Sequence, residues 1–515
     1  MATISLENLD VWRMILQEFE VSLDHDETMI VREKRKAALT LALLSPKLTE
    51  IGLDTLWKSM TTLTPILRVM GACESSFGLP AVVDLDRWYI SRPLSRDKYL
   101  DRVTFYLERV RRFHAPINLH ELEFWHILST LLFRELILPS LRSLSMFITE
   151  TPPLSFSSVV VHILSPSITS ITFVCPHWEG NLPRIQHIVR SRELPNLNEV
   201  IYKLKRRGST LKIPTPPTSS FTAIKRLEVH DDYALKHPRY DSIICSSLKN
   251  MKNLEVLYIR IGPIRREASR NYTVEINFHS LQKLHIVLND RRPAVTWDLP
   301  SLHTLTLSTY LESTDFRGIF SQPFFAQLRH LHLEILRKLD EIPHRGVMFS
   351  SLEPLKDHTN KLQTFRFNGV PLNLSADELT SLVESWPSLR ELSISEGDND
   401  ARPISSSVLV DFSRLACFQD LTLPLDFTFL TEDLSLNASH PASRLTELRC
   451  SRLEGIPNRG SKKIIVFKNL LRLFPNIKKI SAAVDEEGVI EELQELIKSF
   501  RPLPVSNGSQ KLSSL

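Results

Sequence analysis

The chain has 515 residues, of which 42% are apolar and 24% charged, and these proportions suit a folded globular protein and exclude a wholly disordered one. Lys and Arg number 63 against 59 Asp and Glu, so the net charge of +4 does not predict nucleic-acid binding. Only 14 residues are glycine, whereas about 80 are leucine, which is unlike the composition of phosphate-loop enzymes. We therefore expect a large leucine-rich core, divided into domains or built from repeats.

The chain carries no sequence signal for secretion or for a membrane span. Its start, MATISLENLD, has no basic segment followed by an apolar one, and no apolar run approaches the roughly 18 residues of a spanning helix. The five cysteines stand far apart and form no CxxC pair, so neither a disulfide framework nor a zinc ribbon is indicated. We expect an intracellular protein, cytoplasmic or nuclear, that binds no membrane.

Three short helices are predicted in residues 1–60. The first, over residues 6–19, has apolar residues at helical spacing, and the second, over residues 30–44, opens with the basic run REKRK. The third begins with Ser45 as N-cap and Pro46 at the first helical position. These sixty residues are expected to form a helical module of their own.

A short phrase recurs along residues 138–485: an apolar residue, two variable positions, and then two apolar residues separated by one. Thirteen copies follow one another at 21 to 34 residues, with a mean of 28, a period typical of leucine-rich repeats. The LxL that ends each copy predicts a short strand, and the helical spacing in DELTSLVES and KIIVFKNLLRLF predicts a helix before it. The copies begin at Leu141, Ile168, Leu197, Ile224, Leu254, Leu281, Leu302, Leu328, Leu362, Leu389, Phe418, Leu445 and Ile477.

One such repeat cannot bury its own leucines, so neighbouring repeats must stack. The predicted fold class is therefore α/β: an irregular leucine-rich-repeat solenoid, or horseshoe, with parallel strands on the concave face and helices on the other. Residues 61–137 are expected to form a linking helical region before it. The segment EEGVIEELQELIKSF predicts a capping helix over 486–500, and residues 501–515 form a polar tail expected to be disordered.

The N-terminal module resembles an F-box. LENLDVWRMILQEF and KAALTLALLSPKLTEIGLDTLWKSM match the family's leucine-rich first helix, its second helix ending in apolar residues and Ser, and its third helix ending in Leu-Trp. The usual Leu-Pro opening is Leu6-Glu7 in this chain. An F-box followed by leucine-rich repeats is the organisation of the F-box leucine-rich-repeat family, and the chain resembles the members found in basidiomycete fungi.

The resemblance implies a substrate-recognition subunit of an SCF-type cullin ubiquitin ligase. The F-box would bind a Skp-type adaptor, and through it a cullin, while the solenoid would bind a protein substrate that the sequence does not identify. It also implies that Leu56 and Trp57 pack in the core of the module or at its joint with the next part of the chain. The implied adaptor-binding residues are Leu6, Leu9, Ile15, Leu16, Leu44 and Leu48.

No motif for catalysis, cofactor binding or metal binding stands in the sequence. GxSxG, GxxxxGK[ST] and GxGxxG are absent, and HELEFWH at 120–126 has Phe124 where a zincin helix needs its second His. The basic run KLKRRGSTLK at 203–212 is interpreted as a solvated loop, with a kinase site or a nuclear-import patch as alternatives. We expect no catalytic residue, no cofactor and no metal, although fold alone does not exclude an enzyme.

Side chains alternate along a strand, so the residue between the two buried positions of each LxL is predicted to face outward. This column is small and hydroxylated near its ends and large, aromatic or charged in the middle, which favours partner binding there. The candidate substrate-binding residues, taken from this and the neighbouring columns, are Glu228, Tyr258, Arg260, His285, His330, His332 and Arg366. Two alternatives stay open: an exposed strand carries polar residues for solvation alone, and the N-terminal module is only a cap on an interaction scaffold unrelated to ubiquitination.

Overall fold

The structure is a computed structural model. It describes residues 28–61, 64–69, 73–74, 88–89, 96–117, 135–148, 156–175, 194–204, 223–231, 251–261, 274–288, 295–309, 316–335, 347–370, 372–396, 403–434, 443–456, 461–482 and 489–499, and a few single residues between these ranges. The chain divides into two compact units, residues 1–265 (unit 1) and 266–515 (unit 2), and each is described by itself.

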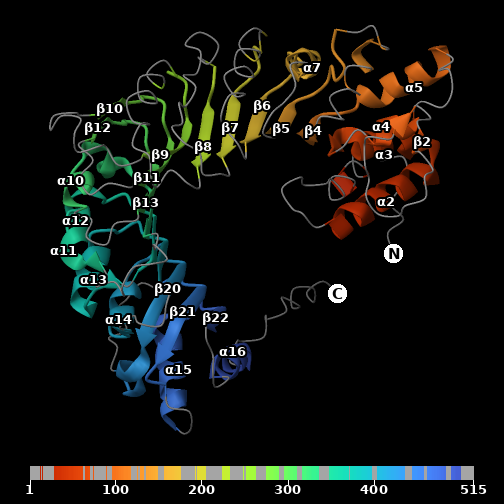
Figure 1. Cartoon of the computed structure of the whole chain (residues 1–515). Coiled ribbons are helices and arrows are strands. Elements are labelled where there is room, and N and C mark those ends of the chain that lie inside the picture. The colour runs from red at the N-terminus through yellow and green to blue at the C-terminus, as the bar shows by residue number, and fades with distance from the viewer. Residues whose placement is uncertain are drawn as a thin grey trace, which may run out of the picture. The chain divides into compact units, whose positions relative to one another are not determined.

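Unit 1 opens with the helices α2 (Thr28–Leu44) and α3 (Pro46–Lys58) (Figure 1). Helix α3 starts as predicted, because the Ser45 hydroxyl accepts a hydrogen bond from the Lys47 amide at 3.3 Å and Pro46 occupies the first turn. Two further helices follow, α4 (Thr64–Val69) and α5 (Arg96–Leu107). The predicted helix over residues 6–19 lies largely outside the described residues.

Helices α2 and α3 approach each other closely at Gly52. A Cβ atom at this position would lie 2.5 Å from the Cβ of Ala42 and 3.2 Å from the carbonyl oxygen of Ala38. Leu48, one turn before Gly52 on α3, is only 1% exposed. Because glycine has no side chain, the two helices meet nearly backbone to backbone and close this face of α3.

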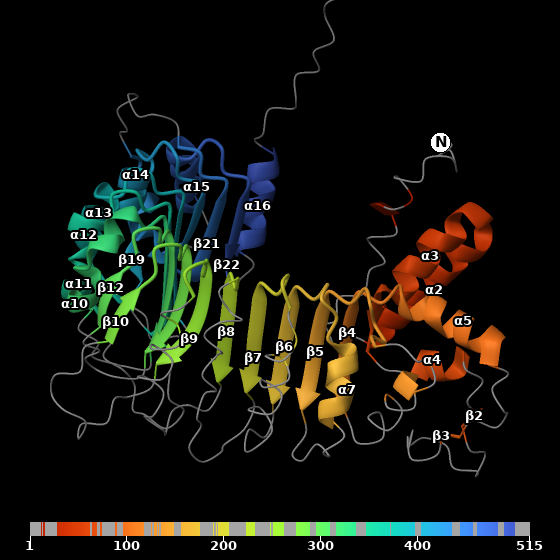
Figure 2. The same cartoon turned by 90° about the horizontal axis from the view of Figure 1, so that it is seen from above.

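The strands of unit 1 run parallel, in the order β1-β4-β5-β6-β7-β8-β9, and Figure 2 shows β4 to β9 side by side. Helix α7 (Phe156–Ile163) precedes β6, and a separate antiparallel pair joins β2 (Cys73–Glu74) to β3 (Trp88–Tyr89). The strands of the parallel sheet are β1 (Ser59–Met60), β4 (Arg112–Ile117), β5 (Ser143–Ile148), β6 (Ser170–Cys175), β7 (Glu199–Leu204), β8 (Arg226–Asp231) and β9 (Val256–Ile261).

The sheet begins earlier in the chain than predicted. Strand β1 follows α3 directly and pairs with β4, which in turn pairs with β5. Val110 and Phe113 are 0% and 1% exposed, like the first and fourth positions of the repeat phrase. The predicted border at residue 138 is therefore wrong, since VRRFHA at 110–115 is a further copy of the phrase, with Ala115 in place of its last large apolar residue.

Unit 2 continues the same pattern, with the parallel strand order β11-β13-β14-β16-β18-β20-β21-β22. These strands are β11 (Lys283–Leu288), β13 (Thr304–Thr309), β14 (His330–Ile335), β16 (Thr364–Gly369), β18 (Glu391–Glu396), β20 (Asp420–Asp426), β21 (Glu447–Glu454) and β22 (Lys479–Ala482). Short parallel pairings join β10 (Val274–Asn277) to β12 (Val295–Asp298), β15 (Val347–Met348) to β17 (Leu372–Asn373), and β19 (Ile404–Ser405) to β20.

Short helices connect the strands of unit 2, and α10 to α14 lie on one side of them (Figures 1 and 2). The helices predicted from DELTSLVES and KIIVFKNLLRLF are present as α13 and α15. Helix α13 starts with a capping box, in which Ser375 and Glu378 exchange side-chain-to-backbone hydrogen bonds. The helical elements are α10 (Arg317–Phe320), α11 (Phe349–Leu352), α12 (Leu355–His358), α13 (Ala376–Glu384), α14 (Val408–Phe412), α15 (Ser461–Leu473) and the 3₁₀ turns η3 (Pro323–Gln327) and η4 (Phe427–Thr431).

The core is the repeated leucine pattern itself. The first residue of each of the thirteen predicted copies is at most 2% exposed. In β13 the alternation also holds, with Leu305 and Leu307 buried and Thr306 partly exposed between them. The period and the register are confirmed, and both units are parts of an α/β solenoid of leucine-rich-repeat type.

Polar side chains just before several copies connect neighbouring repeats. Asn196 Nδ2 donates to the carbonyl of Pro166 at 3.0 Å, and Asn476 Nδ2 donates to the carbonyl of Ser443 at 2.9 Å. The hydroxyl of Ser167 lies within hydrogen-bond distance of two carbonyls of the preceding repeat. These contacts satisfy turn carbonyls that the strand ladder leaves free.

Helix α16 (Val489–Ser499) packs on β22 at the end of unit 2, within the segment predicted as a cap. Leu493 and Ile497 are buried, and Glu492 forms an ion pair with Lys463 of α15. The predicted tail over residues 501–515 lies outside the described residues.

Candidate partner-binding surfaces

The outward column predicted from the LxL phrase exists in both units. Strand pairing in unit 1 sets Ser145 opposite Thr172, Thr172 opposite Ile201, Ile201 opposite Glu228, and Glu228 opposite Tyr258. In unit 2 it sets His285, Thr306, His332, Arg366, Ser393, Thr422, Arg449 and Ser481 side by side in that order. The candidates therefore fall into two groups, with Glu228, Tyr258 and Arg260 in unit 1 and His285, His330, His332 and Arg366 in unit 2.

In unit 1 a connected polar cluster covers β7 to β9. Glu228 accepts a hydrogen bond from Arg226 Nε at 2.7 Å and lies 2.7 Å from His230 Nε2. The ring of His230 stacks on that of Tyr258, with 4.1 Å between centroids and 29° between planes. Arg260 lies on β9, and its side chain is outside what the structure describes. The cluster thus holds an aromatic side chain and a carboxylate in fixed positions.

The Glu228 carboxyl is held strongly in its charged form. Hydrogen bonding with His230, with a smaller contribution from Arg226, lowers its pKa to about 2, although burial opposes this shift. Arg226 pairs with Glu228 and also lies 3.1 Å from Glu199, so one guanidinium serves two carboxylates. This surface therefore presents the rings of Tyr258 and His230 beside paired carboxylates.

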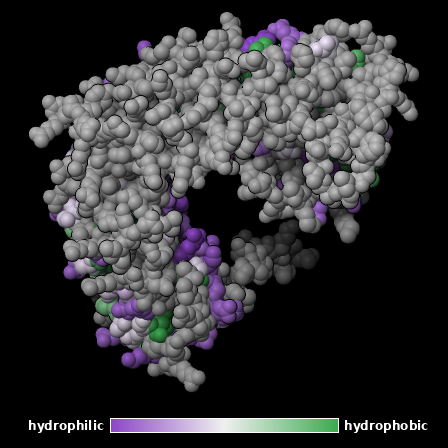
Figure 3. Space-filling view, in the orientation of Figure 1, coloured by the Kyte–Doolittle hydropathy of each residue, from purple (hydrophilic) through white to green (hydrophobic). Residues whose placement is uncertain are grey.

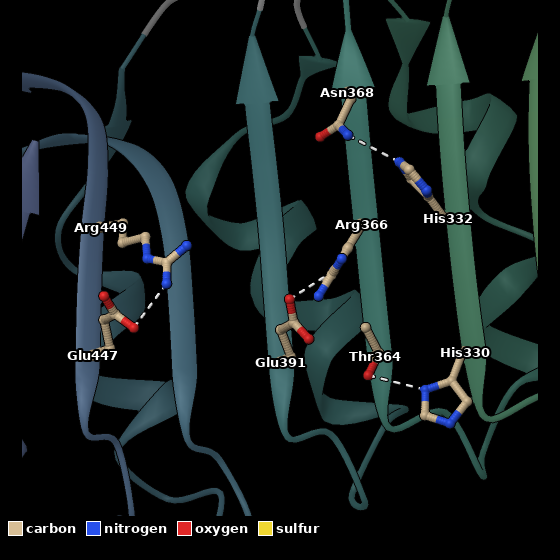
Figure 4. A network of polar contacts seen from close by, with 8 residues as sticks. All are labelled: His330, His332, Thr364, Arg366, Asn368, Glu391, Glu447 and Arg449. Carbon is tan, nitrogen blue, oxygen red and sulfur yellow. Dashed lines mark hydrogen bonds and ion pairs between the residues drawn. The ribbon is translucent and has the colours of Figure 1, made fainter. Parts of the chain in front are cut away.

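In unit 2, His330 and His332 of β14 each form a hydrogen bond with a residue of the neighbouring strand β16 (Figure 4). Asn368 Nδ2 donates to His332 Nε2 at 2.9 Å, and His330 Nδ1 lies 3.1 Å from the hydroxyl of Thr364. Because the amide nitrogen of Asn368 can only donate, Nε2 of His332 accepts this hydrogen bond through its lone pair, as it does in a neutral ring. Burial lowers the pKa of both His330 and His332, which agrees with neutral rings.

His285 belongs to a second chain of hydrogen bonds, which runs from β11 through β13 to β14. Ser308 donates its hydroxyl proton to Glu334 at 2.7 Å, and His285 Nε2 lies 3.0 Å from the same hydroxyl. Since Ser308 has only one proton to give, the Nε2–H of His285 must be the donor to it. Nε2 therefore donates a hydrogen bond on His285 and accepts one on His332, and in both cases the partner lies on the neighbouring strand.

Carboxylates and guanidinium groups pair further along unit 2. Arg366 Nε donates to Glu391 at 2.7 Å, and Arg449 lies 2.8 Å from Glu447 (Figure 4). Lys479 also lies 2.8 Å from Glu447. Hydrogen bonds from Arg449 and Lys479 lower the pKa of Glu447 to about 2. Figure 3 shows hydrophilic residues gathered on the strand side of unit 2. The face is thus polar and internally hydrogen-bonded, as recognition surfaces often are.

The structure changes the predicted adaptor-binding surface. Leu44 is 66% exposed at the end of α2, as that surface requires, whereas Leu48 is 1% exposed between α2 and α3. Assigning Leu48 to the surface was wrong, because it lies on the face of α3 that Gly52 brings against α2. Ile15 is half-buried, and Leu6, Leu9 and Leu16 lie outside the described residues.

An exposed apolar stripe on α2 was missed. Leu39 and Leu43 are 47% and 79% exposed, and with Leu44 they occupy one face at helical spacing (i, i+4, i+5). We call Leu39, Leu43 and Leu44 the α2 stripe. The segment ALTLALL has leucines on every side of the helix, so the leucines alone do not show which side is exposed. The small residues Ala38 and Ala42 mark the side that faces α3, and they could have located the exposed side opposite.

The module is joined firmly to the first strands of the solenoid. The indole of Trp57 stacks on the ring of Tyr106 of α5, with centroids 4.4 Å apart, which confirms its predicted place at this joint. Arg109 forms ion pairs with Glu50 and Asp54 of α3, and its guanidinium lies over the ring of a phenylalanine on α5. The α2 stripe is therefore displayed by a module with a fixed attachment to unit 1.

Other kinds of site find no support in the described residues. There, no group of three or more His, Cys, Asp or Glu side chains is arranged to hold a metal ion. Within the same part of the chain, no helix is both long enough and apolar enough to cross a lipid bilayer.

No family model and no curated protein matches the chain. Among solved structures, the leucine-rich repeat-containing protein LegL7 from Legionella pneumophila is similar over 56% of this chain and 84% of its own, at 14% sequence identity and a TM-score of 0.29. The fold assignment rests instead on the buried repeat register and on the strand pairing. The chain is a leucine-rich-repeat solenoid, an architecture of protein-interaction scaffolds, with an N-terminal helical module. In each unit the outward residues of the parallel strands form a polar surface, which we call the strand face.

Proposed function

We propose that the protein is the substrate-recognition subunit of an SCF-type ubiquitin ligase. The α2 stripe carries this proposal: three leucines exposed on a small helical module that is anchored to the start of a solenoid. A contiguous exposed apolar patch on a module of this kind marks a protein contact. Together with the F-box resemblance of residues 1–60, it supports binding of a Skp-type adaptor, and through it of a cullin.

In this function the protein performs no bond chemistry. The strand face would hold a protein substrate while the module holds the ligase, so that a substrate lysine meets the catalytic partner at high effective concentration. The polar group around Tyr258 on the strands of unit 1 and the polar group around His332 and Arg366 on the strands of unit 2 each support substrate binding on the unit that carries them. Such a protein would work wherever the ligase does, in the cytoplasm or the nucleus.

Adaptor binding is tested with a purified Skp-type adaptor and the double variant Leu43→Asp, Leu44→Asp. Two carboxylates in a surface that must lose its water on binding should weaken the affinity about 100-fold or more. The matched control places the same charges at exposed apolar positions of unit 2, Phe429→Asp and Ile464→Asp. Equal affinity of wild type and the α2 variant, or no binding by either, would refute the F-box assignment.

Substrate binding is tested with a triple variant, Tyr258→Ala, His332→Ala and Arg366→Ala, in a crosslinking comparison with wild type. None of the three side chains is part of the buried leucine pattern, so folding and adaptor binding should persist. Loss of the wild-type crosslinked partners is the expected result. An unchanged set of partners would move substrate binding away from the strand face.

One observation favours the simpler alternative of an interaction scaffold with a helical cap. Strand β1 leaves α3 without a linker and pairs with β4, so the module shields the first strand as a cap does. A cap, however, needs no exposed leucines. Co-purification of an adaptor and a cullin with the protein from cell lysate separates the two functions, since only the ligase subunit retains them.

A further inference from the structure

A group of cationic side chains lies where the strands β11, β13 and β14 begin. Lys283 and His330 are the first residues of β11 and β14, and pairing through Thr304 of β13 sets them in one row. His303 and Arg329 precede β13 and β14, and the Arg329 amide donates to the His303 carbonyl at 2.9 Å. We call Lys283, His303, Arg329 and His330 the cationic rim.

Among the residues that the structure describes, the two permanent charges of the cationic rim form no ion pair with a carboxylate. Lys283 and Arg329 are exposed, and within the described part of unit 2 neither has a carboxylate partner. Elsewhere on the strand face, by contrast, Arg366 pairs with Glu391 and Arg449 pairs with Glu447. The positive charges of Lys283 and Arg329 are thus exposed to solvent and available to pair with a partner.

The four side chains are close enough to affect one another. Burial is the main cause of the lowered pKa of His303, followed by the charges of Arg329 and Lys283. Burial also lowers the pKa of His330, and His303, Arg329 and Lys283 lower it further. The one carboxylate that opposes the shift at His330 is Glu391, and it is already ion-paired with Arg366.

We propose that the cationic rim binds an acidic segment of a protein partner, a short run of Asp and Glu residues laid across the starts of β11, β13 and β14. Charge complementarity is the basis, because arginine and lysine without a carboxylate of their own are suited to pair with one from a partner. The proposal rests on the proposed function of the strand face as the substrate-binding surface and names the chemistry of the substrate segment.

The dimensions of the sheet fit such a segment. Neighbouring strands lie about 4.8 Å apart, so Lys283 and His330, two strands apart, are separated by roughly 10 Å. An extended peptide advances about 3.3 Å per residue, so three to four residues span the rim. Side chains alternate in such a peptide, and every second one would face the protein.

Binding should also take up protons. His303 and His330 are largely neutral in the free protein, because burial and the charges of Lys283 and Arg329 lower the pKa of both rings. A bound carboxylate would stabilise the protonated rings and raise both values. Affinity should therefore rise as pH falls from 7.5 to 5.5, a range in which glutamate carboxyls of the ligand stay charged.

The test measures fluorescence anisotropy of a fluorescein-labelled octaglutamate peptide with the full-length protein at low salt. Binding that strengthens at least threefold from pH 7.5 to 5.5 is expected. The double variant Lys283→Gln, Arg329→Gln should weaken it at least tenfold. The charge-matched control Lys462→Gln, Lys478→Gln, at exposed sites of unit 2 on α15 and just before β22, should leave it unchanged. Equal weakening by both variants, or no binding at all, would overturn the proposal.

Two further binding measurements test the role of the histidine rings and the chemistry of the ligand. The variant His303→Gln, His330→Gln should bind at pH 7.5 and lose the pH dependence, and retention of that dependence would refute the role of the rings. Labelled oligothymidylate of eight nucleotides should bind less tightly than octaglutamate, and the reverse order would assign the rim to nucleic acid and overturn the proposal. Adaptor binding, measured on the same variants, should stay at the wild-type level, so a failure at the rim is distinguishable from a failure of the F-box assignment.

Discussion

Gln494 on α16 accepts a hydrogen bond from the backbone N–H of Ile480 on β22, with 2.8 Å between the amide oxygen and the backbone nitrogen. The same side chain donates to the carbonyl of Lys478 at 3.1 Å. Strand β22 is the last in the sheet order of the described residues, so these backbone groups lie on an edge that no described strand covers. A glutamine amide carries the donor and acceptor of a peptide group, and here it forms the hydrogen bonds that a neighbouring strand would form.

The change Gln494→Leu should destabilise this edge by about 1–2 kcal/mol, because two hydrogen bonds are lost while the size of the side chain is kept. Hydrogen exchange at the Ile480 amide reports the loss locally and should accelerate. Glu491→Gln, on the exposed side of the same helix, is the control and should leave that exchange rate unchanged. Unaltered exchange in Gln494→Leu would show that α16 does not protect the strand edge.

Gly52→Ala should destabilise the N-terminal module, although alanine ordinarily stabilises a helix interior by about 0.5–1 kcal/mol relative to glycine. The added methyl would lie 2.5 Å from the Cβ of Ala42, so the helices must separate. Hydrogen–deuterium exchange of peptides from α2 and α3 should be faster in this variant.

The contact at Gly52 also supplies its own control. Adding Ala42→Gly to Gly52→Ala removes the Cβ atom at 2.5 Å but leaves the Cα of residue 42 at 2.9 Å, so the double variant should recover only part of the lost protection. A single variant as well protected as wild type would contradict the close approach of α2 and α3.

The solenoid register predicts opposite effects at neighbouring positions of β13. Leu305→Ala should cost about 2–5 kcal/mol, because it leaves a cavity between repeats, whereas Thr306→Ala should cost little. Urea unfolding midpoints of the two variants measure the difference. Equal shifts of the midpoint would be incompatible with the register.

The fold could be predicted because the apolar positions that recur in the sequence are the same residues that form the buried core. An apolar residue in the position of Leu302 opens each of the thirteen copies and is buried in each, so periodicity alone located the strands and their outward column. The strand β4 was missed for a specific reason. Val110 and Phe113 fill the buried positions of its phrase, but Ala115 replaces the third large residue, and a search for LxL passes over it.

The surfaces could be predicted only in part. Leu44 and Leu48 look equivalent in the sequence, and only the contact of Gly52 with Ala42 decides that Leu48 faces inward. The column of outward residues followed from alternation. The partners of those residues did not, since Asn368 reaches His332 across 36 positions of sequence, and hydrogen bonds between repeats leave no local pattern.

Glu228 should make the free energy of unfolding of unit 1 depend on pH in the acidic range. Hydrogen bonding with His230 and the charge of Arg226 lower its pKa from 4.5 to about 2 in the folded protein. A carboxyl with a lowered folded pKa stabilises the fold above the unfolded pKa, and this contribution is lost as pH falls from about 4.5 toward 2.

The variant Glu228→Gln has no such charge, so it should be less stable than wild type at pH 6 and should lose less stability than wild type between pH 6 and pH 3. Urea midpoints at the two pH values test this, with Glu255→Gln as the control, since Glu255 pairs with Lys225 on the exposed surface near the same strands. If Glu228→Gln and wild type lose the same stability between these pH values, Glu228 is not held in its charged form by Arg226 and His230.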